Sequence, residues 1–188
     1  MDLKRILDVL LAVCGLLALS SVLVIVALMI RFTSKGGALF IQDRVGRNEV
    51  IFKCLKFRTM AKDTPDVGSH EADRSWVTPL GRILRKTKLD ELPQLVNVLK
   101  GEMSLVGPRP CLPSQEELIC ARRTFNVFSM RPGITGIAQI QGVDMSTPWE
   151  LAELDAAYLV KNDVRTYGSI IYRTVLGQGR GDAAKGPG

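Results

Sequence analysis

The chain has 188 residues, enough for one domain with a hydrophobic core and an additional segment, and its 25 lysines and arginines against 19 aspartates and glutamates give a net charge of +6. One histidine and four cysteines without a C-x-x-C pair argue against a structural zinc site, and no disulfide is required, which fits the reducing cytoplasm. The positive excess lies after residue 30 and is compatible with nucleic acid, anionic lipid or a phosphorylated substrate.

The first element is an uncharged apolar run from Val9 to Ile30. As a helix with a rise of about 1.5 Å per residue it would measure roughly 33 Å, enough to cross the core of a bilayer. The run is longer than the apolar region of a signal peptide, and no small-x-small cleavage motif follows it. A buried helix of a soluble protein is the other alternative, and the length argues against it. We therefore expect residues 1–35 to form a membrane anchor.

Cations flank this run on both sides. They are Lys4, Arg5, Arg31 and Lys35. Because positive charge favours the cytoplasmic side, a straight span would satisfy one flank only, whereas a helix that bends and returns to the same leaflet satisfies both. Ser20 and Ser21 lie near the middle, and serine hydroxyls can bond to preceding carbonyls and bend a helix. The sequence therefore predicts a re-entrant anchor.

Two strands are expected next, at residues 38–42 and 50–58, joined by a turn at residues 43–48. Strict alternation in the second strand places Lys56 and Arg58 on one face. That face is either a solvated surface or a contact for an anion. The polar stretch that follows, residues 62–75, is predicted to be a loop in which His70 is solvated and not catalytic.

A helix is predicted to start at Thr78-Pro79, with the threonine as N-cap and the proline in the first turn. The next helix must place Pro93 in its first turn, since an interior proline costs about 3 kcal/mol. This puts Asp90 and Glu91 at or beside its N-terminus, and Gly101 ends it. Its expected buried stripe consists of Leu92, Leu95, Val96 and Leu99.

The remaining elements alternate between strand and helix. We expect strands at residues 103–106 and 134–140, helices at residues 115–128 and 149–160, and a flexible tail at residues 177–188. Arg122 and Arg123 are predicted to be exposed. The last helix carries Val164, Tyr167, Ile171 and Val175 at helical spacing. This apolar face either packs on the core or lies in the lipid interface.

The carboxylate pair Asp90-Glu91 is the strongest candidate for chemistry. A helix start favours negative charge, and Arg85 and Lys88 nearby also favour an ionised Asp90. Such a carboxylate can attack phosphorus or bind a hard cation, for which magnesium is the natural choice. An Asp-Glu pair at a helix start can equally be simple capping, so the interpretation depends on the surrounding residues.

Arginines held between prolines support the catalytic interpretation. Arg109 lies between Pro108 and Pro110, and Arg131 precedes Pro132-Gly133. Proline restricts the conformation of its neighbours, and a preorganised guanidinium suits bidentate phosphate recognition. Together five cations could neutralise a diphosphate and a second phosphate. They are Lys56, Arg58, Arg85, Arg109 and Arg131.

Five blocks that follow the basic-flanked apolar segment, in this order, resemble the bacterial sugar transferases, the small monotopic phosphoglycosyl transferases. The blocks are Lys56-Phe57-Arg58-Thr59-Met60, Leu89-Asp90-Glu91-Leu92-Pro93-Gln94-Leu95, Gly107-Pro108-Arg109-Pro110, Arg131-Pro132-Gly133-Ile134-Thr135-Gly136, and Tyr158 with Lys161-Asn162. The resemblance covers residues 2 to about 176. One difference is that the family commonly has Ser-Pro at the break in the membrane helix, whereas this chain has Ser20-Ser21.

The resemblance implies an α+β fold, with the re-entrant helix and a small cytoplasmic catalytic domain of short strands and amphipathic, interface-associated helices at residues 36–176. It also implies transfer of a sugar-1-phosphate from a UDP-sugar to a polyprenol phosphate at the bacterial inner membrane, with release of UMP. Asp90 would form a covalent phosphosugar intermediate and hold Mg²⁺ with diphosphate oxygens, and Glu91 would act as a base or set the geometry.

The expected partners are therefore a UDP-sugar, a polyprenol phosphate and membrane lipid, and no nucleic acid. Two alternatives follow from the residues. In the first, the lipid phosphate attacks the UDP-sugar directly while both substrates are bound. In the second, the chain is a non-catalytic, membrane-tethered protein that binds anionic lipid or nucleic acid.

Overall fold

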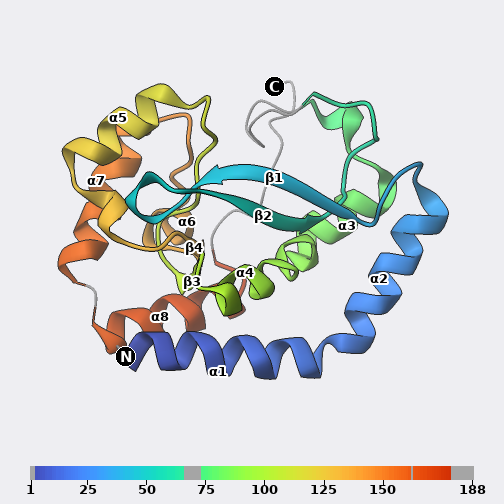
Figure 1. Ribbon diagram of the computed structural model, residues 1–188, viewed down its shortest axis with the longest axis horizontal. Helices are drawn as coiled ribbons and strands as arrows, with labels where there is room; N and C mark the ends of the chain where they lie inside the picture. Colours follow the sequence, from blue (N-terminus) through green and yellow to red (C-terminus); the bar gives the residue numbers. More distant parts are fainter. Residues whose placement is uncertain (1–2, 66–72, 162, 179–188) are drawn as a thin grey trace.

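The computed structural model describes residues 3–65, 73–161 and 163–178 (Figure 1). Helices and strands alternate along the chain. They are α1 (Leu3–Ala18), α2 (Ser20–Thr33), β1 (Leu39–Val45), β2 (Ile51–Phe57), α3 (Pro79–Thr87), α4 (Gln94–Lys100), β3 (Ser104–Val106), α5 (Glu116–Thr124), β4 (Gly133–Thr135), α6 (Ile137–Gln141), α7 (Pro148–Val160) and α8 (Val164–Val175). The predictions for His70, Asn162 and residues 179–188 lie outside the described residues.

The N-terminal apolar run forms two helices, α1 and α2, that are bent by 63° at their junction (Figure 1). The Ser20 hydroxyl donates a hydrogen bond to the Leu17 carbonyl across the break, at 2.9 Å. The predicted bend is therefore confirmed. Within the described residues no single helix has the length and hydropathy to cross a bilayer, although the bent pair taken together does.

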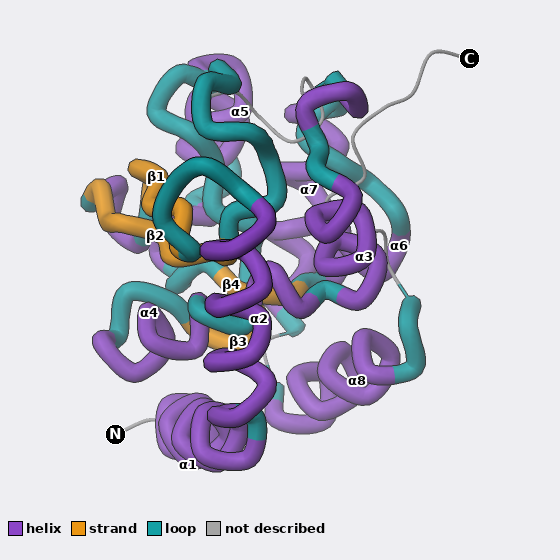
Figure 2. The backbone as a smooth tube through the Cα atoms, turned by 90° about the vertical axis from the view of Figure 1, so that its right-hand side faces the viewer, coloured by secondary structure: helices purple, strands orange, loops and turns teal. Residues whose placement is uncertain are grey.

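Helix α1 packs against the rest of the molecule along its length. Ala12 is fully buried in a hydrophobic cluster with Leu95 and Val98 of α4 and Met103 beside β3. Figure 2 shows that α1 also runs side by side with α8, with which it is in contact. The hydrophobic core therefore crosses the boundary at residue 35 that the sequence predicts between anchor and catalytic domain.

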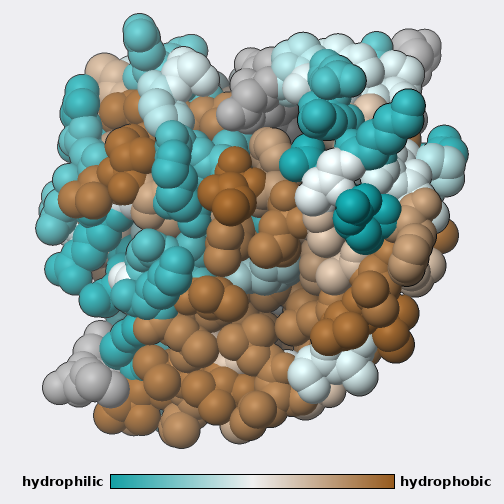
Figure 3. Space-filling model, turned by 45° about the vertical axis from the view of Figure 1, so that its right-hand side comes forward, coloured by the Kyte–Doolittle hydropathy of each residue, from teal (hydrophilic) through white to brown (hydrophobic). Residues whose placement is uncertain are grey.

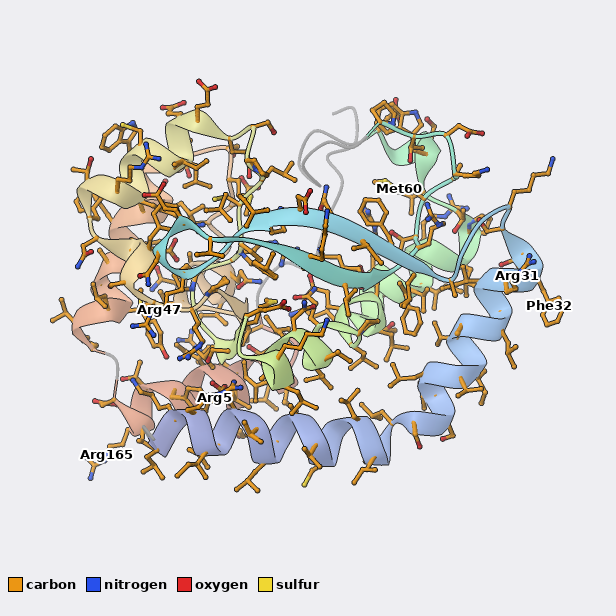
Figure 4. All side chains as sticks on the ribbon, viewed as in Figure 1. Arg5, Arg31, Phe32, Arg47, Met60 and Arg165 are labelled. Atoms are coloured by element: carbon orange, nitrogen blue, oxygen red, sulfur yellow. The ribbon has the colours of Figure 1, made fainter. Side chains whose placement is uncertain are left out.

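Polar side chains at the start of α1 strengthen this packing. The Arg5 guanidinium donates to the carbonyls of Val98 and Leu99 at the end of α4, at 2.7 and 3.2 Å. In Figure 4 Arg5 lies on the side of α1 that faces the domain. The buried Asp8 carboxylate accepts hydrogen bonds from the Ser104 hydroxyl and from the Tyr167 hydroxyl. A charged helix end thus binds to partners from α4, β3 and α8.

Strands β1 and β2 form an antiparallel hairpin in which Phe40 is opposite Lys56. The first strand is longer than the sequence predicts, because residues 43–45 continue the pairing as far as Val45 opposite Ile51. The chain reverses at a 3₁₀ turn over Arg47–Glu49, where Asn48 and Glu49 have left-handed backbone conformations. Asparagine tolerates this conformation without a glycine. The reversal therefore uses the last two residues of the expected turn together with Glu49, which lies just after it.

Helix α4 lies against the hairpin through a buried asparagine. The Asn97 amide accepts a hydrogen bond from the Leu55 N–H at 3.0 Å and donates to the Lys53 carbonyl at 2.8 Å. The buried face of α4 therefore contains Asn97 and Val98 as well as Leu95, and Val96 and Leu99 are only half-buried. The predicted stripe was partly wrong because this short helix is covered on two sides, by α1 and by β2.

The predicted strand at residues 134–140 is confirmed only for residues 134 and 135, and was wrong for the rest. Strand β4 ends at Thr135 after pairing in parallel with β3, and residues 137–141 form helix α6. A short apolar run has no period that separates a strand from a buried helix. The two strands approach very closely, since a Cβ on Gly133 would lie 2.1 Å from the backbone nitrogen of Gly107.

The predictions for side-chain exposure in the C-terminal half have different outcomes in the structure. Arg123 is exposed as expected, and it forms an ion pair with Glu49. Arg122 is buried instead of exposed, because its guanidinium lies 2.7 Å from the buried Asp155 carboxylate of α7. In α8, Tyr167 and Ile170 are buried against the core, whereas Val175 is 80% exposed. The apolar face of α8 is thus divided between the core and the surface.

Exposed apolar side chains gather on the N-terminal helix pair. Figure 3 shows this surface at the lower part of the molecule. The most exposed members are Leu3, Leu10 and Leu17 on α1 and Val24, Ile25, Leu28 and Phe32 on α2. In Figure 4 Phe32 points outward at the end of α2. This surface is opposite the faces of α1 and α2 that pack on the domain.

Candidate active site

A cationic cavity lies where the hairpin meets α3 and the 3₁₀ turn Leu89–Glu91. Five cations line it, and Asp90 is the only carboxylate among the described residues of its wall. The cations are Arg44, Lys56, Arg58, Lys62 and Arg85. This excess of positive charge around one carboxylate is suited to a polyanionic ligand such as a diphosphate.

The cavity residues Lys56 of β2 and Arg58, which directly follows this strand, keep the predicted alternation. Both line the cavity, so the shared face is confirmed. Arg58 is held at the strand end, where its Nε donates to the Gly37 carbonyl at 2.9 Å and its guanidinium lies 5.8 Å from the centroid of the Phe40 ring. The strand and the residue after it thus present two cations to one cavity.

Arg44 is a cavity residue that the sequence analysis missed. It is buried, its Nε donates to the Gln42 side chain at 2.9 Å, and its Nη1 donates to the Pro110 carbonyl at 3.0 Å. Gln42 and Arg44 share a face of β1 with Phe40. The even-numbered alternation was therefore a usable signal, but it was lost because the predicted strand ended at Gln42.

Arg85 reaches the cavity because α3 starts very close to the end of the hairpin. The Thr78 hydroxyl caps the helix by accepting from the Gly81 N–H at 2.9 Å, as predicted. A Cβ on Gly81 would lie 2.0 Å from the Thr59 carbonyl oxygen, so only glycine permits this approach. About one helical turn later, the Arg85 Nε donates to the Thr59 hydroxyl at 2.9 Å.

The carboxylate pair lies in the 3₁₀ turn that precedes α4, and α4 itself begins at Gln94 after Pro93. The turn is entered through Lys88, which has a left-handed backbone conformation. Both carboxylates are buried. The predicted position beside a helix start is therefore confirmed, with the proline before the first α-helical residue.

Glu91 faces a second cavity, which is mostly apolar and has a volume of about 200 Å³. Its carboxylate oxygen Oε1 lies 2.9 Å from Arg109 Nη2 and 3.6 Å from Lys56 Nζ. Arg109 and Lys88 also line this second cavity. Glu91 therefore lies between Lys56, one of the cations of the first cavity, and Arg109, a cation of the second.

Two buried arginines fix the backbone of the loop that carries Arg109. Arg122 Nη1 donates to the Arg109 carbonyl at 2.8 Å, and Arg44 Nη1 donates to the Pro110 carbonyl. Arg131 has a different environment. Within the described residues it lines neither cavity, and its Nε donates to the Gly101 carbonyl at 2.9 Å. Of the five predicted phosphate-binding cations, the structure brings Lys56, Arg58 and Arg85 together with Asp90, and Arg109 with Glu91.

The donor set fits a magnesium ion shared with a substrate. Within the described residues no group of three or more His, Cys, Asp or Glu side chains could hold a metal by itself. Mg²⁺ is usually bound by one or two carboxylates together with substrate phosphates and water. Asp90, on the wall of a cavity suited to phosphates, supplies that kind of ligand.

Comparison with known proteins identifies the family. A model described as bacterial sugar transferase matches residues 1–179. The chain belongs to the bacterial sugar transferase family. Family membership was predicted from the motif order, and it is confirmed.

Curated relatives of this family member come from several bacteria. The exopolysaccharide production protein ExoY of Sinorhizobium fredii is 40% identical over 156 residues, which cover 74% of this chain and 69% of the relative. A UDP-glucose:undecaprenyl-phosphate glucose-1-phosphate transferase of Caulobacter vibrioides is 44% identical over 144 residues, 74% of this chain and 54% of the relative. A UDP-N-acetylgalactosamine-undecaprenyl-phosphate N-acetylgalactosaminephosphotransferase of Aeromonas hydrophila is 38% identical over 141 residues, 73% of this chain and 33% of the relative. This chain thus spans from about a third to about two thirds of the length of these relatives.

Proposed function

We propose that this sugar transferase moves a sugar-1-phosphate from a UDP-sugar to a polyprenol phosphate and releases UMP. The observation that carries the proposal is the position of Asp90, a buried carboxylate on the wall of a cavity with five cations. Two relatives are named for transfer from UDP-sugars to undecaprenyl phosphate, which supports the same reaction class for this chain.

In the first step an oxygen of the Asp90 carboxylate attacks the phosphorus that carries the sugar. The bond between this phosphorus and the oxygen that bridges it to UMP breaks, and UMP leaves with the bridging oxygen and the electron pair. The phosphosugar is now bonded to Asp90. Arg44, Lys56 and Arg58 line the same cavity and stabilise the negative charge on the transferring phosphoryl group and on the leaving phosphate.

In the second step a phosphate oxygen of the lipid attacks the same phosphorus. The bond to Asp90 breaks, the carboxylate is regenerated, and the product is a polyprenol diphosphate that carries the sugar. Glu91, held at 2.9 Å from Arg109, is positioned to accept a proton from the lipid phosphate or to orient the Arg109 guanidinium toward it. Magnesium, when bound by Asp90 and diphosphate oxygens, would neutralise charge on the phosphates.

The proposed location is the cytoplasmic face of the bacterial inner membrane. The bent pair α1 and α2 would enter the lipid and return to the same leaflet, with its apolar exposed side chains in contact with acyl chains. The inner side of α1 packs on Leu95 and Val98 of α4, and the inner side of α2 packs on Phe57 of β2 and Leu84 of α3. A membrane contact through this pair would therefore keep the cavities at the lipid surface.

The decisive experiment supplies the purified enzyme with UDP-sugar and magnesium but no lipid acceptor, traps the protein and determines its mass. The proposal predicts a phosphosugar adduct on Asp90 and its absence from Asp90→Asn. A parent enzyme that turns over but shows no trapped adduct would favour direct attack by the lipid phosphate. A protein that binds anionic lipid in a salt-dependent manner and releases no UMP would be a binding protein instead.

A further inference from the structure

The lining of the apolar cavity beside Glu91 does not suit the UDP-sugar donor. The apolar part of its wall is built from aliphatic side chains of α4, β3, β4 and α8 and of the residue that follows the 3₁₀ turn Leu89–Glu91. They include Leu92, Leu95, Leu105, Ile134, Ile171 and Val175. UDP and a sugar are strongly polar, and such groups lose hydrogen bonds to water when they enter an apolar space. This cavity therefore suits a hydrocarbon.

On the basis of the proposed function, we infer that this cavity receives the first isoprene units of the polyprenol phosphate. Its phosphate would lie at the end of the cavity where Lys88 and Arg109 meet Glu91. An apolar protein cavity of about 150 Å³ holds a molecule the size of benzene. The volume of about 200 Å³ is thus sufficient for a five-carbon unit next to the phosphate.

The charges at this end are complementary to a phosphate monoester. Arg109 Nη2 is bound to Glu91 at 2.9 Å, and the Lys88 ammonium lies 3.4 Å from the Gln178 carbonyl oxygen. Both cations line the cavity together with the carboxylate. An incoming phosphate would therefore meet two positive side chains beside a group able to accept its proton.

The cavity also borders an exposed apolar part of α8. Val175, on its wall, is 80% exposed, and its neighbours Tyr172 and Leu176 are exposed as well. Helix α8 lies beside α1, whose exposed side chains are apolar (Figures 2 and 3). A lipid tail leaving the cavity past Val175 would stay on apolar surface.

The test uses Val175→Trp, because this exposed residue can be enlarged without disturbing the core. The matched control is Val164→Trp, an exposed valine on the same helix that lines neither cavity. Each detergent-solubilised variant is assayed for adduct formation with UDP-sugar alone, and for the KM of a short-chain polyprenol phosphate in the full reaction. We expect the KM to rise about tenfold or more in Val175→Trp and to stay within about twofold in the control, a decade being ~1.4 kcal/mol.

The adduct assay separates this inference from the proposed function. If the parent forms the adduct and Val175→Trp leaves the KM for the lipid unchanged, the inference is wrong while the proposed function stands. An equal rise in both variants also contradicts it, since that would be a general effect of the surface of α8. Loss of adduct formation in Val175→Trp alone would assign the cavity to the donor. Absence of the adduct from the parent is a failure of the covalent step itself.

A second variant tests the same wall without added bulk. Val175→Glu places a charge at an exposed position, where it does not affect folding, but it is unfavourable beside a hydrocarbon. We expect a rise in the lipid KM of the same direction, with adduct formation retained. An unchanged lipid KM in Val175→Glu would likewise overturn the inference.

Discussion

Asp90 and Glu91 are adjacent in the chain, yet Asp90 lines the cationic cavity and Glu91 lines the apolar one. The reason is local backbone geometry. The pair lies in a 3₁₀ turn, where successive side chains point about 120° apart because there are three residues per turn. Two carboxylates that are adjacent in the chain can therefore line two different cavities.

This division predicts different consequences for two conservative substitutions. Asp90→Asn removes the proposed nucleophile, so both the adduct and UMP release should disappear. Glu91→Gln should still form the adduct with UDP-sugar alone, while the transfer to lipid falls by about 10²–10⁴-fold if it acts as a general base. Single-turnover measurements of the two steps check this. Equal loss of both steps in Glu91→Gln would contradict the division of roles.

The cationic cavity predicts a graded loss of donor affinity. Arg85→Ala removes one cation from the wall and one partner of Thr59, and we expect the KM for UDP-sugar to rise about 10- to 100-fold, the equivalent of a charged hydrogen bond. Arg123→Ala is the matched control, because this exposed arginine binds Glu49 and lines neither cavity. Its KM should be within about twofold of the parent. A similar rise in both variants would mean that overall charge, not the cavity, controls donor binding.

The buried pair Arg122–Asp155 predicts a large effect on stability. Burial raises the pKa of Asp155, and Arg122 opposes this shift. Arg122→Met would leave the carboxylate without its partner, at a cost of about 3–5 kcal/mol in the free energy of unfolding. Chemical denaturation followed by tryptophan fluorescence measures the loss.

The double substitution Arg122→Met with Asp155→Leu removes both charges and should restore most of this stability. It should not restore the lipid step, because the hydrogen bond from Arg122 to the Arg109 carbonyl is still missing. If the double variant recovered full transfer activity, Arg122 would have no part in positioning Arg109.

Tyr167 predicts a loss of stability in alkaline solution. Burial, and then its hydrogen bond to Asp8, raise the pKa of Tyr167 above the ordinary tyrosine value. The unfolded chain therefore loses this proton first, near pH 10, so the stability is complete below about pH 10 and falls as the pH rises further. We expect Tyr167→Phe to be less stable by about 1.5–3 kcal/mol at neutral pH, with a shallower fall between pH 9 and 11. Thermal unfolding of the parent and of Tyr167→Phe at several pH values checks both the loss of stability and its pH dependence. If the stability of the two proteins fell equally with pH, Tyr167 would not be the cause of the alkaline loss.

The re-entrant arrangement predicts that both ends of the helix pair lie on one side of the membrane. Cysteines introduced at positions 2 and 35, in a background without the exposed Cys14 and Cys120, should both resist an impermeant thiol reagent in intact spheroplasts. Both should react after permeabilisation. Reaction of one position only, before permeabilisation, would show that the pair spans the bilayer.

Local signals in the sequence were sufficient for much of the fold. Thr78 caps α3, Gly101 ends α4 in a left-handed conformation, and the alternation of Lys56 and Arg58 places both on one cavity. Each of these features depends on residues within a few positions of one another. They follow from backbone geometry and side-chain period, which a sequence contains directly.

Other features depend on partners that are distant in the chain. Arg44 is buried because it bonds to Pro110, 66 residues away, and Arg122 because it bonds to Asp155, 33 residues away. An arginine is read as exposed when its partner is unknown, since an unpaired buried charge is very costly. Helix α6 was not predicted for a related reason. The conformation of its short apolar run depends on the elements that pack against it.

The sequence by itself determined the family, the carboxylate pair and the apolar N-terminal segment, because each is a contiguous or ordered pattern of residues. Only the tertiary structure decided which carboxylate lines which cavity, that Arg131 lines neither, and that α1 is part of the core. Packing between segments far apart in the chain determines where a side chain points and which residues it contacts. No local sequence pattern contains that information.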